Sequence, residues 1–114
     1  MATAEECRKA LENLTGRLSD MSPEERAAHL IDRTLSCTVS DLGITFLTRL
    51  GPDGAGPVTE ATAADPPAQI RFTTKSDDLL VIAGDPGSIA RAWLTGRLKV
   101  EGSLFDLIRL RKLL

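Results

Sequence analysis

Apolar residues change their spacing along the chain, and this change divides it into helical and extended segments. From residue 4 to 18 they recur every three or four positions, which predicts an amphipathic helix. Thr3 and Glu6 form a capping-box pattern at its start. A second box, with a proline at the first helical position, predicts a short helix from about residue 23 to 32.

Strict alternation of apolar and polar residues follows, and it predicts strands with one buried face. Leu35, Cys37 and Val39, for example, alternate with serine and threonine. The predicted strands span residues 34–40, 44–50, 58–63, 69–74 and 97–101. Of these, 58–63 is poor in apolar residues and is expected at a sheet edge. The Gly- and Pro-rich stretch 51–57 is expected to form neither helix nor strand.

Helical spacing returns after the fourth strand. Ser76 is expected to cap a short helix over residues 77–83. A further helix is expected to end at Gly96. Its predicted buried side carries Ile89, Ala90, Trp93 and Leu94. Ser103 is the expected cap of a final helix.

These elements together predict the fold class. Strands with one apolar face fit a largely antiparallel sheet that helices cover on one face and water covers on the other. We therefore expect an α+β, two-layer domain with five strands. The chain length is that of one domain, so residues 1–114 are expected to form a single unit.

The final predicted helix is more apolar than a surface helix needs to be. Its apolar residues are Leu104, Phe105, Leu107, Ile108, Leu110, Leu113 and Leu114. At about 100° per residue they cover more than half of the helix circumference, whereas one stripe suffices to bury a surface helix. Three explanations stay open: a buried core helix, one wall of an apolar ligand cavity, or a contact with a second copy of the chain.

Composition excludes several classes of function. Apolar residues make up 42% and charged residues 26%, as in ordinary soluble proteins. The formal net charge of −2 gives the chain as a whole no attraction to nucleic acid or to anionic membranes, and no nucleic-acid partner is expected. The longest apolar run, Leu79–Ala83, is far too short to span a bilayer, and no signal peptide is recognisable. We therefore expect a cytoplasmic protein.

Residues with catalytic or metal-binding chemistry are scarce. The single histidine, His29, lies off the apolar stripe of its predicted helix and has no second histidine with which to share a metal ion. Cys7 and Cys37 form no closely spaced pair, so two reduced, buried thiols are expected. No serine has an assignable base. We therefore expect no catalytic residues, no metal, no cofactor and no enzymatic activity.

The segment from Trp93 to Gly102 resembles the signature of sterol carrier protein 2 (SCP2) domains. That signature is an aromatic residue, a variable residue, Ser or Thr, Gly, a basic residue, Leu, Lys, an apolar residue, a variable residue and Gly. Residues 107–114 are similar to the leucine-rich closing helix of the family, and residues 70–80 to its strand and short helix. Trp93 stands where many members carry phenylalanine, and Glu101 where lysine is common.

This resemblance implies a five-stranded sheet with helices on one face and a hydrophobic tunnel between the two layers. It also implies a carrier that holds a fatty acid, a fatty acyl chain or a sterol without catalysis. The expected lining residues are Phe46, Phe72, Leu80, Ile89, Trp93, Leu104, Leu107 and Ile108. Ordinary core packing is the alternative for each of them, and above all for the two strand phenylalanines.

A second function fits the same fold. The chain could serve as a dimerisation or accessory module whose core is filled by side chains and binds no lipid. The oligomeric state is therefore open between monomer and homodimer. Cations near the chain end, among them Arg109 and Arg111, are compatible with transient contact with an anionic membrane during lipid exchange.

Overall fold

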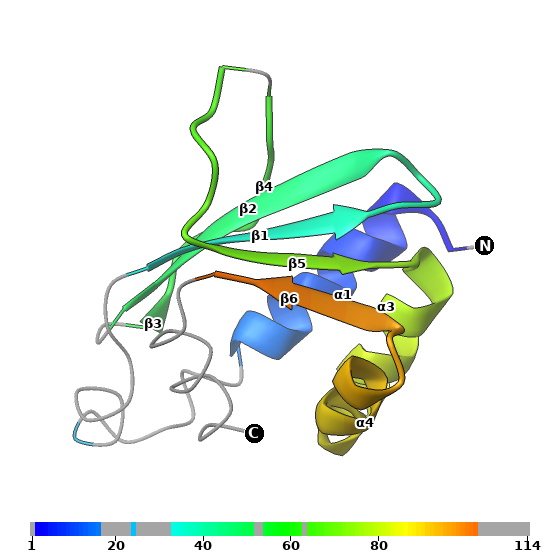
Figure 1. Ribbon diagram of the computed structural model, residues 1–114. Coiled ribbons are helices and arrows are strands. Elements are labelled where there is room, and N and C mark those ends of the chain that lie inside the picture. Colours follow the sequence, from blue (N-terminus) through cyan, green and yellow to red (C-terminus); the bar gives the residue numbers. More distant parts are fainter. Residues whose placement is uncertain (1, 17–23, 25–32, 52–53, 63, 103–114) are drawn as a thin grey trace.

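The computed structural model describes residues 2–16, 24, 33–51, 54–62 and 64–102, as a layer of helices against a layer of strands (Figure 1). The elements are α1 (Ala4–Gly16), β1 (Arg33–Val39), β2 (Ile44–Gly51), β3 (Gly54–Ala55), β4 (Thr59–Glu60), β5 (Ile70–Thr74), α3 (Ser76–Gly84), the 3₁₀ turn η2 (Pro86–Ser88), α4 (Ile89–Leu94) and β6 (Leu98–Glu101). The predicted helices over residues 23–32 and from Ser103 onward lie outside the described residues, apart from Glu24.

The strands form one sheet in the order β3-β2-β1-β5-β6, and β4 pairs with the same edge of β2 as β3 does. β3 lies opposite Leu50 and Gly51 at the end of β2, and β4 lies opposite Phe46 and Leu47 in its middle. These two short strands share one edge, so the sheet has five strand positions. β1 and β5 run parallel, whereas the other described pairs are antiparallel. The predicted α+β fold with a largely antiparallel sheet is confirmed.

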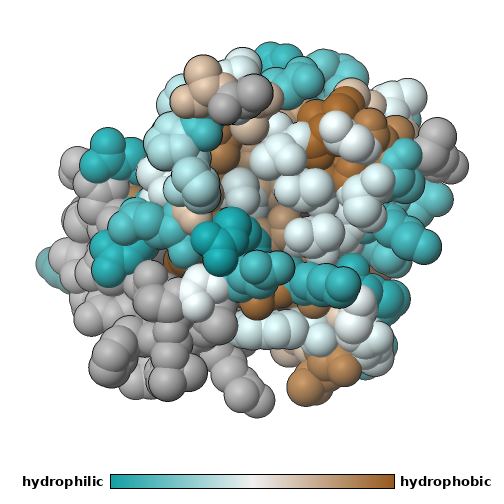
Figure 2. Space-filling view, turned by 45° about the horizontal axis from the view of Figure 1, so that its top comes forward, coloured by the Kyte–Doolittle hydropathy of each residue, from teal (hydrophilic) through white to brown (hydrophobic). Residues whose placement is uncertain are grey.

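The two faces of the sheet differ in polarity. α1, α3 and α4 lie on one face (Figure 1). The side chains on that face form an apolar row in register across four strands: Phe46, Cys37, Phe72 and Val100. The opposite face carries a polar row in the same strands: Thr45, Thr38, Thr73 and Lys99. Figure 2 shows that hydrophilic and neutral residues cover most of the visible surface around this outer face.

Two apolar clusters lie between the layers. The first joins α1 and α3 to β1 and β2, and its buried residues are Ala2, Cys7, Ala10, Cys37, Val39, Phe46, Val58 and Leu79. The second joins α3 and α4 to β6 through Ile82, Ala92 and Leu98. Phe72 on β5 packs against both clusters, so it links the two halves of the core.

The stretch 51–57 does contain a strand, contrary to the sequence prediction. Gly54 and Ala55 form β3, which pairs with the end of β2 through Gly51. The Gly56 amide also donates to the Arg49 carbonyl, at 2.8 Å. Backbone groups alone make these bonds, so the pattern of side chains does not reveal them.

The predicted buried side of α4 is wrong at two positions. Ala90 is exposed, and Leu94 exposes 80% of its surface. Ala92, which exposes only 1%, is the residue that packs against Ile82 and Leu98. Ala92 and the partly buried Ile89 pack against this cluster and set the orientation of the six-residue helix α4, which turns Leu94 toward solvent.

The start of α3 is held by a residue from the β1–β2 turn. The Ser76 amide and hydroxyl both donate to the carboxylate of Asp41, at 2.8 and 2.6 Å. The Ser76 hydroxyl in turn accepts a hydrogen bond from the Ala2 amide, at 3.1 Å. Ser76 is therefore not the helix cap that its position predicts, because Asp41 satisfies the helix N-terminus from a distant part of the chain.

Candidate functional site

The helix-facing side of the sheet carries two of the expected lining residues, Phe46 and Phe72. Successive side chains of a strand point to opposite faces, so every second residue of each strand faces the helices. Phe46 on β2 and Phe72 on β5 lie on either side of Cys37 on β1 in the same row. Phe46 exposes 4% of its surface, and Phe72 is half-buried. An aromatic surface therefore lies directly beneath α1 and α3.

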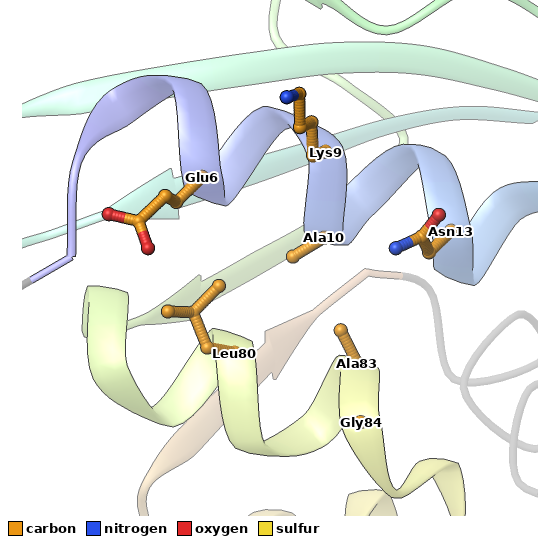
Figure 3. Close-up of a pocket in the computed structure, with 7 residues that line it drawn as sticks. All are labelled: Glu6, Lys9, Ala10, Asn13, Leu80, Ala83 and Gly84. Atoms are coloured by element: carbon orange, nitrogen blue, oxygen red, sulfur yellow. The ribbon is translucent and has the colours of Figure 1, made fainter.

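A groove of about 340 Å³ runs between α1 and α3 (Figure 3). Its lining residues are Glu6, Lys9, Ala10, Asn13, Leu80, Ala83 and Gly84. Figure 3 shows Leu80 and Ala83 pointing from α3 toward α1, and Ala10 pointing from α1 toward α3. The middle of the groove is therefore apolar, and its volume exceeds the roughly 300 Å³ at which small-ligand pockets begin.

Polar groups lie along the α1 side of the groove. The carboxylate of Glu6 accepts a hydrogen bond from the Thr3 amide, at 3.1 Å, which completes the capping box predicted at the start of α1. Lys9 projects away from α3, and Asn13 lies at the other end of the groove from Glu6 (Figure 3). This arrangement, with an apolar centre and a polar margin, suits an apolar chain better than a phosphate or a sugar.

The structure brings some of the predicted lining residues together. Phe46, Phe72 and Leu80 all belong to or pack against the first apolar cluster. Ile89 packs against the second cluster, which also contacts Phe72. Trp93 is half-buried on α4. Three further predicted residues lie outside the described part of the chain: Leu104, Leu107 and Ile108.

Small residues of the groove were not predicted from the sequence. Ala10, Ala83 and Gly84 line it together with Leu80, the one predicted lining residue among them. Alanine and glycine carry no chemical signal of a site. Ala10 belongs to the apolar stripe that predicts α1, and this spacing was the only available indication that it faces another element.

The two buried thiols, Cys7 and Cys37, are poor nucleophiles at neutral pH. Both cysteines are free and buried. Burial raises the pKa of the Cys37 thiol to about 12. Burial also raises the pKa of Cys7, with a smaller effect from the charge of Asp41. Thiolates are the nucleophilic form, so neither residue suits covalent catalysis. Among the described residues, no three histidine, cysteine or acidic side chains gather as a metal site.

Comparison with known proteins depends on the fold, because no protein-family model and no curated protein matches the sequence. The solution structure of palmitated SCP2L2 from Aedes aegypti is similar to this chain with a TM-score of 0.67 and 16% identity, covering 98% of this chain and 94% of that one. The solution structure of Sterol Carrier Protein-2 from Aedes aegypti in complex with palmitate is similar with a TM-score of 0.61 and 16% identity. The match covers 96% of this chain and 92% of that one.

A part of a much larger enzyme is also similar. The sec-alkylsulfatase Pisa1 from Pseudomonas sp. matches with a TM-score of 0.57 and 20% identity, over 76% of this chain and 13% of that chain.

In the described part of this chain, no helix has the length and apolarity needed to cross a membrane. The near-complete coverage by the two mosquito proteins shows that this chain has the fold of sterol carrier protein 2 domains.

Proposed function

We propose that the protein is a non-catalytic carrier that binds one long apolar chain, such as a fatty acid, between its sheet and its helices. The observation that carries this proposal is the structural match to a palmitated protein of the same fold, which covers 98% of this chain. A second palmitate complex, matched over 96% of the chain, supports the same ligand class. The buried free thiols suit a reducing compartment, so we place the carrier in the cytoplasm.

The proposed ligand contacts are the residues expected from the sequence. Phe46 and Phe72 form the floor, and Leu80, Ile89 and Trp93 approach from the helices. Half-buried apolar side chains such as Phe72, Leu80 and Ile89 support this assignment, because they can lose further surface to a ligand. The proposal assigns the wall opposite the floor to three residues of the apolar C-terminal segment: Leu104, Leu107 and Ile108.

The free-energy cost of an empty apolar cavity supports a site that is occupied by a ligand. An empty apolar cavity of about 300 Å³ would cost on the order of 7 kcal/mol, at about 24 cal/mol per Å³. The stability of a domain is only about 5–15 kcal/mol. A closed tunnel of that size would therefore fill with a lipid or collapse. This reasoning makes the bound carrier, rather than an empty tunnel, the stable form.

A thermal melt in the presence of palmitate tests the proposal. A ligand at about 100 times its dissociation constant adds about 2.7 kcal/mol of stability. For a domain of this size the melting temperature should rise by roughly 10 °C. Cholesterol is the parallel probe for a sterol ligand. The absence of a shift with both acyl chains and sterols would overturn the carrier proposal.

Two adjacent residues of α3 provide a matched pair of variants. Leu80 is half-buried in the groove, whereas Val81 exposes 54% of its surface. Leu80→Gln should weaken palmitate binding about tenfold, because it puts a polar group against the acyl chain. Val81→Gln should leave the affinity unchanged. Titration calorimetry on both variants measures the difference, and equal affinities would show that the ligand does not contact this groove.

The exposed leucine of α4 favours one alternative, a dimerisation or accessory module with a filled core. Leu94 exposes 80% of its surface, which a second copy of the chain or an accessory partner could cover. In that case the molecular mass in sedimentation would rise with protein concentration, and palmitate would change neither the mass nor the melting temperature. The two functions therefore give opposite results in the same pair of measurements.

A further inference from the structure

One end of the helical layer exposes an apolar residue among cations. We name the exposed residues Ala90, Arg91, Leu94 and Arg97 the α4 surface. Arg91 and Leu94 are three positions apart, so they lie on the same side of α4. Trp93, which precedes Leu94 in α4, is half-buried. The burial of Ala92 on the opposite side keeps Leu94 directed at solvent.

Backbone hydrogen bonds define how the chain turns at the end of α4. Gly96 has a φ of 79°, and its amide donates to the Trp93 carbonyl, at 3.3 Å. The Arg97 amide donates to the Ala92 carbonyl, at 3.0 Å, which completes a Schellman motif. The Arg97 guanidinium then donates through Nε to the Thr95 hydroxyl, at 3.1 Å. Arg97 therefore lies beside the end of α4 and is exposed to solvent.

The segment is cationic although the protein is acidic. Residues 86–100 contain Arg91, Arg97 and Lys99 but no aspartate or glutamate, whereas the whole chain has a formal net charge of −2. Lys99 is in register with Thr73 in the polar row of the outer face of the sheet. The two arginines therefore supply the positive charge of the α4 surface, and Lys99 belongs to a different face.

We propose that the α4 surface docks the protein onto an anionic lipid bilayer. An exposed leucine can enter the acyl boundary, while arginines beside it bind the phosphates of the headgroups. The proposal rests on the proposed function in one respect: a lipid carrier must meet the membranes from which its ligand comes.

Vesicle sedimentation tests the docking surface in the full chain. The probe is vesicles of phosphatidylcholine with phosphatidylglycerol, against vesicles of phosphatidylcholine alone. The wild-type protein should bind the anionic vesicles more tightly, and raising the salt from about 0.05 to about 0.5 M should release it, because the charges become screened. Trp93, the only tryptophan, should shift its fluorescence to the blue on binding.

Variants locate the contact. Arg91→Ser and Leu94→Ser should each weaken binding to anionic vesicles about fivefold or more, since each removes one favourable contact with the membrane. Lys99→Ser removes one positive charge from the outer face of the sheet and is the matched control, which should bind nearly as well as the wild type. Circular dichroism checks that every variant is folded. Equal loss in Lys99→Ser and Arg91→Ser would overturn the proposal in favour of a general charge effect.

Two further outcomes would also overturn the docking proposal. One is no binding of the wild-type protein to anionic vesicles at low salt. The other is concentration-dependent dimerisation that Leu94→Ser abolishes, which would assign the surface to a second copy. The palmitate melt contains no vesicles, so the carrier proposal can fail while docking is observed, and docking can fail while palmitate still stabilises the protein.

Discussion

At the scale of single residues, Asp41 and Ser76 connect parts of the chain that are far apart in sequence. The carboxylate of Asp41 accepts both hydrogen bonds of Ser76, and Ser76 also receives the Ala2 amide. Ser76 is fully buried, so the loss of these partners would leave polar groups without water. The three residues thereby hold the start of α3 against the turn between β1 and β2.

The charge of Asp41 gives a pH-dependent prediction. The side-chain hydrogen bond from Ser76 lowers the pKa of Asp41 below its ordinary value. Its contribution to stability is therefore present above the unfolded-state pKa of about 3.9, and it is lost as the pH falls through the lower folded-state pKa. Asp41→Asn should lower the melting temperature near neutral pH, and the gap to the wild type should close in acid.

Asp78→Asn is the control, because it removes a carboxylate from the first turn of the same helix but leaves the bonds of Ser76 intact. Thermal melts of both variants across the acid range give the comparison. A gap between Asp41→Asn and the wild type that stays constant from about pH 7 to about pH 3 would show that the carboxylate charge contributes nothing.

At the scale of the elements, the ends of the helices decide how the layers join. Gly96 ends α4 with a left-handed φ of 79°, which turns the chain back into β6. A side chain at that position would meet open space, so only the backbone conformation resists substitution. Gly84, which ends α3, is also open but has no left-handed φ.

Gly96→Ala and Gly84→Ala should therefore differ in their effect on stability. Gly96→Ala should lower the free energy of unfolding by about 1–2 kcal/mol, because alanine is strained in the left-handed region. Gly84→Ala should be neutral or slightly stabilising, since it reduces the freedom of the unfolded chain. Urea denaturation measures both values. Equal effects of the two substitutions would contradict the assigned role of the Gly96 turn.

The elements also show how far sequence reasoning reached. Alternation of apolar and polar residues predicted β1, β2, β5 and β6, because each strand buries one face. It did not reveal β3, which pairs through backbone groups alone, or the exposure of Leu94, which depends on the packing of Ala92 against two other elements. Asp41 and Ser76 are 35 residues apart, so no local pattern announces their contact.

The candidate site was predicted in part for the same reason. Phe72 and Leu80 lie on the apolar faces of regular elements, and the spacing of apolar residues identified both. The groove between α1 and α3 depends on how closely two helices approach, and small residues such as Ala10 and Ala83 set that distance. This approach is a property of the packed molecule rather than of either segment.

At the scale of the whole molecule, one face of the sheet carries polar side chains, and the helices α1, α3 and α4 cover the other face (Figure 1). The first face carries the polar row of Thr38, Thr45 and Thr73. The second face carries Phe46 and Phe72, which lie in or against the apolar core, and the groove runs between two of the helices that cover this face, α1 and α3. A carrier with this architecture would hide its ligand on the helical side and would meet a membrane through the α4 surface.

Native mass spectrometry with palmitate tests the central claim most directly. A carrier should show one added mass of palmitate per chain, and gentle activation in the gas phase should release it. Protein taken directly from purification should also hold an apolar molecule that organic solvent extracts. If the spectrum shows only the mass of the unliganded chain, and no palmitate or cholesterol binds at any ratio of ligand to protein, the protein is not a lipid carrier.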